Sequence, residues 1–166
     1  MENLLQEVRV TPAFLPGNMA EFLMAGFRKV DGAIFFYSLF DRDFLPDHEF
    51  IKNAYTDLSG YEFSVNKLHL EDYCDSECLR SGIIFADKFL SLWRGQFSES
   101  AVALLTYDKN PEFGEICTFQ FHKKREGEVI IDFDKIEEFS NPVLGIDTSF
   151  GGGVEVVYKG VTQCIA

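Results

Sequence analysis

The chain has 166 residues, a formal net charge of −12 at pH 7 and a hydrophobic content of 46%. This length and composition are typical of one globular domain, spanning residues 1–166, that can build its own core. The charge argues against nucleic-acid binding, which needs clustered basic residues, because the densest basic run is only Lys123-Lys124-Arg125. No apolar stretch approaches the ~18–20 residues of a membrane span, and the acidic start is the wrong charge for a signal peptide. We therefore expect a cytoplasmic protein that binds neither nucleic acid nor membrane.

Two apolar runs near the N-terminus predict a β-hairpin. Residues 22–29 and 33–40 flank Asp31-Gly32, a pair that favours a tight turn because glycine adopts a positive φ without strain. Both runs are apolar on both faces, as in strands that are covered on both sides. We therefore expect these two strands to lie in the centre of the sheet.

The next segment predicts a helix followed by a strand. Pro46-Asp47 can open the helix, and Gly60 is placed to end it. The apolar stripe of this helix consists of Phe50, Ile51, Ala54, Tyr55 and Leu58. From Tyr61 apolar residues alternate with polar ones, and the alternation shifts by one residue at Asn66-Lys67, which predicts a strand with a bulge or turn.

A second, longer helix follows, and after it the chain predicts a meander. Asp75 or Ser76 can cap the helix, and Gly95 lies beyond its expected end. Its inward positions, spaced by three and four residues, are Leu79, Ile83, Ala86, Leu90 and Trp93. Residues 101–107, 116–122 and 128–133 then predict three antiparallel strands.

The C-terminal part completes the fold prediction. Asp134 and Glu137 have the spacing of a capping box for one short helix that ends at Asn141-Pro142, and residues 154–158 predict a last strand. Strand pairs interrupted by helices lack the strict alternation of a parallel sheet. The sequence therefore predicts an α+β fold: a curved, largely antiparallel sheet with two main helices on one face and one short helix.

Four cysteines, Cys74, Cys78, Cys117 and Cys164, do not indicate a disulfide framework in a chain that can build its own core. We expect reduced thiols. Cys74 and Cys78, together with His69, offer three zinc ligands, whereas a structural zinc site normally has four. The ordinary interpretation is two partly buried thiols at a helix start, so no metal or other cofactor is expected, although the sequence leaves metal binding by Cys74 and Cys78 open.

Other patterns resemble active-site motifs without completing one. Asp147-Thr148-Ser149 resembles the active-site loop of aspartic proteases, which needs a second aspartate to share a proton. The ordinary interpretation is a strand end closed by an Asx-type turn. Gly151-Gly152-Gly153 lacks the lysine of a phosphate-binding loop and predicts a hairpin connection. The histidines, His48, His69 and His122, are expected to be solvated, and we expect no enzymatic activity.

Two acidic clusters concentrate the charge locally. The first consists of Glu71, Asp72, Asp75 and Glu77, within seven residues that contain no lysine or arginine. The second consists of Asp132, Asp134, Glu137 and Glu138, with Lys135 among them. Helix capping and solvation explain acids at such positions, since a helix N-terminus stabilises negative charge. The functional interpretation is a contact surface for lysine and arginine side chains of a partner protein.

A small, acidic, aromatic-rich α+β domain with no catalytic set resembles the bacterial immunity proteins of contact-dependent inhibition and polymorphic toxin systems. The resemblance lies in overall character and carries over no functional residue. It implies stoichiometric binding of a cognate toxin domain, often a basic nuclease, with acidic residues that speed association. An acidic accessory protein of a phage or mobile element, or a small hydrolase, is the alternative.

Overall fold

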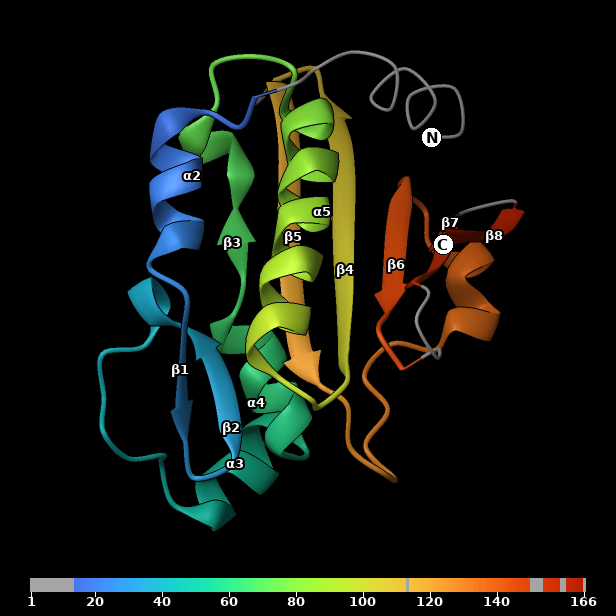
Figure 1. The fold of residues 1–166 in the computed structure, drawn as a ribbon. Helices are drawn as coiled ribbons and strands as arrows, with labels where there is room; N and C mark the ends of the chain where they lie inside the picture. The colour runs from blue at the N-terminus through green and yellow to red at the C-terminus, as the bar shows by residue number, and fades with distance from the viewer. Residues whose placement is uncertain (1–13, 113, 150–153, 159–160, 166) are drawn as a thin grey trace.

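The computed structural model describes residues 14–112, 114–149, 154–158 and 161–165, and it shows an α+β fold with two antiparallel sheets (Figure 1). The helices are α2 (Gly17–Met24), α3 (His48–Tyr55), α4 (Leu58–Val65) and α5 (Cys78–Gln96), and the short 3-10 segments are η1 (Tyr37–Leu39), η2 (Leu70–Tyr73) and η3 (Phe133–Glu138). The strands are β1 (Phe27–Val30), β2 (Ala33–Phe36), β3 (Leu68–His69), β4 (Ala101–Asn110), β5 (Gly114–Lys123), β6 (Val143–Asp147), β7 (Val154–Tyr158) and β8 (Val161–Ile165). The predicted fold class is confirmed.

The larger sheet has the strand order β3-β5-β4-β6-β7-β8, and β1 and β2 form a separate two-stranded sheet. Helix α5 crosses one face of β4 and β5, with α2 beside it (Figure 1). The main core fills this face and has Phe36 near its centre, within ring contact of Phe22, Phe85 and Phe121. Aromatic pairs of this kind add to the gain from burying apolar area, so the many phenylalanines chiefly build the layer between helix and sheet.

The opposite face of the sheet has a smaller apolar cluster. Leu104 and Val143 point into it from β4 and β6, and Ile136 covers them from η3. The two helices that share the main core are α2 and α5. The other helix that the sequence predicts on this face is α3, and it lies with α4 at the end of the sheet (Figure 1). In the described part of the chain no helix has both the length and the apolarity needed to cross a membrane.

The predicted hairpin is confirmed at its turn but not in its extent or position. Asp31 and Gly32 both have positive φ, and β1 pairs with β2 around them. Residues 22–24 belong to α2 instead of to the first predicted strand, because Met19, Phe22 and Leu23 bury one side of this helix. The hairpin is not central in the main sheet: its apolar residues are covered by helices and by the main core.

The prediction for residues 58–70 is wrong in two respects. Gly60 does not end a helix but lies in the first turn of α4, where Asp57 accepts a hydrogen bond from its amide. A β-carbon at Gly60 would collide with the Tyr55 carbonyl, so glycine is needed there for space. The alternation after Tyr61 falls on this helix, which places apolar residues on several sides, and the strand is reduced to Leu68–His69.

The predictions for the second half are mostly confirmed, with three exceptions. Strands β4 and β5 pair along their whole length, and α5 buries Leu79, Ile83, Ala86 and Trp93 while leaving Leu90 half-buried. Gly95 lies inside α5, and residues 128–133 form no strand beyond a single bridge between Arg125 and Glu128. The short helix is the 3-10 segment η3, capped by Asp132 instead of by Asp134. Of β6 the sequence predicts only the end at Asp147, and it does not predict β8.

Polar side chains of α4 join the small sheet to the large one. The Glu62 side chain is completely buried and accepts hydrogen bonds from the amides of Ile34 on β2 and Lys123 on β5. Asn66, one turn later, accepts from the Phe36 amide and donates to the carbonyls of Ile34 and Phe121. These side chains replace the strand that would otherwise pair with the edges of β2 and β5.

Arg125 neutralises the buried carboxylate. Its two terminal nitrogens lie 2.8 Å from the two oxygens of Glu62, a bidentate pair. The same guanidinium donates to the hydroxyl of Ser59 and to the carbonyl of Gly32. A buried charge is tolerated only when it is paired and hydrogen-bonded, and this arrangement meets both conditions.

Replacing Glu62 by glutamine will destabilise the protein by about 3–5 kcal/mol, because Arg125 loses its counter-ion and an amide NH₂ faces backbone donors. Urea denaturation measures the free energy of unfolding. Glu49→Gln, an exposed carboxylate in α3, is the matched control and will change it by less than about 0.5 kcal/mol. Equal effects of the two substitutions would show that the Glu62 junction is not a major determinant of stability.

Two glycines of α5 make a second matched pair. A β-carbon at Gly82 would lie 2.8 Å from the Cys117 sulfur and 3.0 Å from a Leu105 methyl, whereas a β-carbon at Gly95 would have no atom of the described residues within 4 Å. Gly82→Ala will cost about 1–3 kcal/mol through overpacking, and Gly95→Ala will stabilise the helix by up to about 1 kcal/mol. Thermal unfolding of both variants tests whether the two changes in stability have opposite signs. A gain in stability for Gly82→Ala would contradict the close packing of α5 on the sheet.

Candidate functional site: an acidic pocket beside a disulfide

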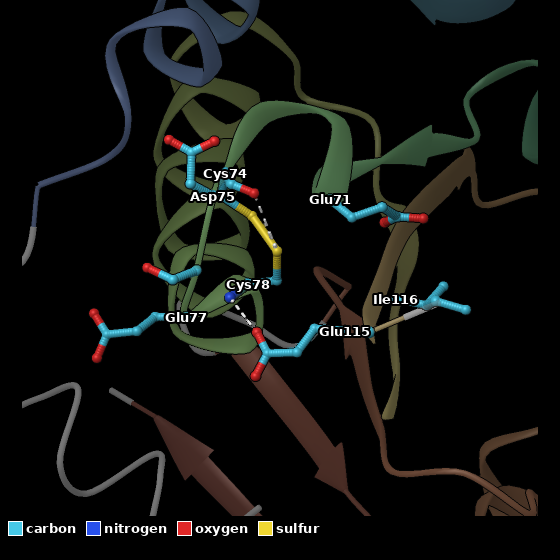
Figure 2. Close-up of a pocket in the computed structure, with 9 residues that line it drawn as sticks. Glu71, Cys74, Asp75, Glu77, Cys78, Glu115 and Ile116 are labelled. Atoms are coloured by element: carbon cyan, nitrogen blue, oxygen red, sulfur yellow. Dashed lines mark hydrogen bonds between the residues drawn. A yellow bond between two sulfur atoms is a disulfide. The ribbon is translucent and has the colours of Figure 1, made fainter. Parts of the chain in front are cut away.

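The first acidic cluster lies where three segments meet at one end of the main sheet. Strand β3 continues into η2, which carries Glu71 and Asp72, and residues 74–77 then lead into α5. The β4–β5 hairpin approaches from the other side and brings Glu115 opposite the start of α5 (Figure 2). Pairing of Leu68 and His69 with β5 fixes η2 against that strand.

These segments enclose an open pocket of about 650 Å³. Its lining residues are Glu71, Cys74, Asp75, Ser76, Glu77, Cys78, Gly114, Glu115 and Ile116. Four of the nine are acidic, and none is lysine or arginine. Clefts lined by charge of one sign concentrate the field and attract groups of the opposite sign, so this pocket favours a cation.

Two of the carboxylates are held by backbone amides. Glu71 accepts a hydrogen bond from the amide of Cys117, and its other oxygen lies 3.0 Å from Nδ1 of His69. Glu115 accepts from the amide of Cys78, the first residue of α5 (Figure 2), and from the hydroxyl of Tyr107. Their negative charge therefore has a fixed position, and no side-chain ordering is needed when a ligand binds.

The remaining acids of the first cluster are exposed. Asp72, Asp75 and Glu77 all face solvent, and among the described residues only Glu77 has an ion-pair partner, Arg80 at 3.7 Å. Glu77 precedes α5 with φ of +54°, a left-handed conformation that is unusual for a residue with a side chain. The prediction that Asp75 or Ser76 caps α5 is wrong. Glu115 on β5 accepts the hydrogen bond from the first amide of the helix instead, and no local sequence pattern could reveal this contact.

The expectation of four reduced thiols is wrong for two of them. Cys74 and Cys78 form a disulfide that lines the pocket, so their sulfurs are not available as zinc ligands (Figure 2). No group of three potential ligands for a metal ion occurs in the part of the chain that the structure describes. Cys117 is a free, buried cysteine, and burial together with the charges of Glu71 and Glu115 raises the pKa of its thiol to about 12. The side chain of Cys164 lies outside the described residues.

The second acidic cluster is separate from this pocket and more involved in local structure. Asp132 caps η3 by accepting from the Asp134 amide, and it also lies 3.3 Å from the ammonium group of Lys135. Asp134 and Glu138 are exposed on the same segment. Glu137 belongs to η3, but its side chain is outside the described residues. The structure thus does not bring the two predicted clusters together.

The protease-like motif is a strand end, as its ordinary interpretation predicts. Asp147 ends β6, accepts from the amide of Ser149 in an Asx-type turn and lies 2.6 Å from the ammonium group of Lys124. Burial acts to raise the pKa of Asp147, but hydrogen bonds from Lys124 and Ser149 hold it below its usual value. Its oxygens are occupied by these donors, an arrangement unlike a pair of carboxyl groups sharing a proton. Gly151-Gly152-Gly153 lies outside the described residues.

His122 is buried, contrary to the prediction of solvated histidines. It is 2% exposed and packs edge-on against Phe63 of α4. Its Nδ1 lies 2.8 Å from the Lys123 carbonyl, whereas Nε2 is buried and has no hydrogen-bond partner among the described residues. Desolvation lowers the pKa of this imidazole. His48 and His69 are exposed, as predicted.

The free energy of unfolding will therefore decrease as the pH falls below about 6.5, the ordinary histidine pKa. The unfolded chain binds a proton there while the folded protein does not, and protonation then favours the unfolded state by up to about 1.4 kcal/mol per pH unit. Urea denaturation between about pH 7.5 and about pH 5.5 measures this slope. His122→Phe will flatten it and His48→Gln will not; an unchanged slope in His122→Phe would exclude His122 as its source.

Comparisons with known proteins give a family but no activity. The model of the "Uncharacterized protein PM0498" family matches residues 1–158. The Pasteurella multocida (strain Pm70) protein of that name is 30% identical over 120 residues, which cover 71% of this chain and 76% of the relative. No solved structure matches. The matched region includes both acidic clusters and the residues of the α4 junction, and the chain belongs to the PM0498 family.

Proposed function

We propose that this protein is an immunity-type inhibitor that binds a basic toxin domain through the first acidic cluster. The observation that carries the proposal is the pocket between η2, α5 and β5, whose ionisable lining is entirely acidic. A second pocket of about 620 Å³, beside α3, has Lys52 and His48 as well as acids in its lining and does not concentrate charge of one sign.

Binding would combine two contributions. The charge of −12 attracts a basic partner from a distance and raises the association rate. The fixed carboxylates of Glu71 and Glu115 then accept hydrogen bonds from a lysine or arginine side chain in the pocket, while Asp72, Asp75 and Glu77 contact neighbouring basic residues. The protein would act by covering the toxin in a one-to-one complex, without catalysis.

The second cluster is the less favoured surface in this proposal, because part of its charge is already neutralised by Lys135. A cytoplasmic location belongs to the same proposal. Disulfides rarely persist in the cytosol, so in that compartment the Cys74–Cys78 pair would be kept largely as thiols.

The first test is whether the product of the adjacent gene is toxic when expressed alone and co-purifies with this chain at one-to-one stoichiometry. We expect toxicity to disappear on co-expression. A harmless neighbour that does not bind would exclude it as the partner and remove the genetic basis of the immunity proposal. Binding that vanishes at moderate salt would favour the alternative of a charge-mimicking accessory protein, since contacts of a buried interface are screened much less.

The second test measures association kinetics with the partner so identified. Asp72→Asn combined with Asp75→Asn will slow association by roughly tenfold at low salt, because both charges flank the pocket. Asp134→Asn combined with Glu138→Gln removes the same net charge from η3 and will have a smaller effect. If the η3 variant slows association more, the second cluster is the interface.

A further inference from the structure

The Cys74–Cys78 disulfide lies in the wall of the acidic pocket. Both cysteines line the pocket, but Cys78 is 3% exposed whereas Cys74 is half-buried. Cys78 is also fixed at the start of α5 by the hydrogen bond from its amide to Glu115. Because Cys74 is the more exposed of the two residues, we expect a thiol entering the pocket to attack the sulfur of Cys74.

Acidic residues line the pocket on both sides of this bond. Asp75 and Glu77 belong to the loop that the disulfide closes, and Glu71 and Glu115 lie across the pocket (Figure 2). An attacking thiolate is itself an anion, so these carboxylates repel it. A thiol that also bears an ammonium group is instead drawn into the pocket by the same carboxylates.

We propose that the Cys74–Cys78 disulfide is a thiol–disulfide exchange site that selects cationic thiols, such as aminothiols or cysteines flanked by basic residues. The proposal is independent of the immunity function, since it concerns the reactivity of the bond and not the identity of a toxin. It predicts that the charge of a thiol, more than its size, decides how fast it reduces this disulfide.

The thiol–disulfide exchange proceeds in two steps. The thiolate RS⁻ attacks Sγ of Cys74, an R–S–Sγ bond forms, the Sγ–Sγ bond breaks, and Cys78 leaves as a thiolate that takes up a proton. A second RS⁻ then attacks the sulfur of R in the mixed disulfide, which releases RSSR and leaves Cys74 as a thiol after protonation. The protein disulfide gains two electrons, and two molecules of the cationic thiol are oxidised to one disulfide.

The experiment compares cysteamine, 2-mercaptoethanol and 2-mercaptoethanesulfonate, which are cationic, neutral and anionic. Reduction of the air-oxidised, full-length protein is followed by alkylation and mass spectrometry, and each rate is divided by the rate of the same thiol with a neutral model disulfide. We expect the normalised rate of cysteamine to exceed that of the sulfonate by at least about tenfold at low salt and to approach it at high salt. Early quenching will locate the cysteamine adduct on Cys74.

Matched variants separate the pocket from the overall charge. Asp75→Asn combined with Glu77→Gln will lower the cysteamine preference severalfold, whereas Asp134→Asn combined with Glu138→Gln, which removes the same charge from η3, will leave it nearly unchanged. Equal normalised rates for the three thiols, equal effects of both variants, an adduct on Cys78, or free thiols at both cysteines of the oxidised protein would each overturn the proposal.

Discussion

The arrangement of this protein depends on one buried ionic junction. Glu62 and Asn66 project from α4 between the edges of β2 and β5 and satisfy the backbone groups that a pairing strand would otherwise satisfy. Arg125 closes the junction from the chain that follows β5. Because these groups are desolvated, their hydrogen bonds have a strict geometry, and they fix where the small sheet and its helices lie against the large one.

Carboxylates at the two ends of the main sheet therefore have different roles. At the lower end of β5 in Figure 1, the buried carboxylate of Glu62 is paired with Arg125 and stabilises the fold. At the other end, around Glu71 and Glu115, carboxylates are fixed by backbone amides while no lysine or arginine lines the pocket beside them. The same residue type is neutralised by arginine in one place and, in the other, is hydrogen-bonded to backbone amides without a basic residue in the described pocket lining, and this contrast is the physical basis of the proposed binding site.

Local patterns in the sequence were sufficient for the elements that depend on local physics. The turn at Asp31-Gly32, the apolar spacing of α5 and the β4–β5 meander all follow from periodicity and turn chemistry. The failures share a different cause. Gly60 is required by contact with Tyr55, α5 is capped by Glu115 from another strand, and the burial of Glu62 depends on Arg125. The contacts of Glu115 and Arg125 join residues far apart in the chain, and the requirement at Gly60 depends on the path of the backbone between α3 and α4, so neither follows from periodicity or turn chemistry. For the site, the sequence located the first cluster but not the disulfide or Glu115.

The Glu62–Arg125 pair also has a consequence for synthesis on the ribosome. The partners are 63 positions apart, and β5 lies between them. Until the second partner emerges, the nascent N-terminal half contains a carboxylate whose final environment is apolar, and burying it alone is unfavourable. Docking of the hairpin and α4 onto β5 is therefore unfavourable until Arg125 has emerged to neutralise Glu62.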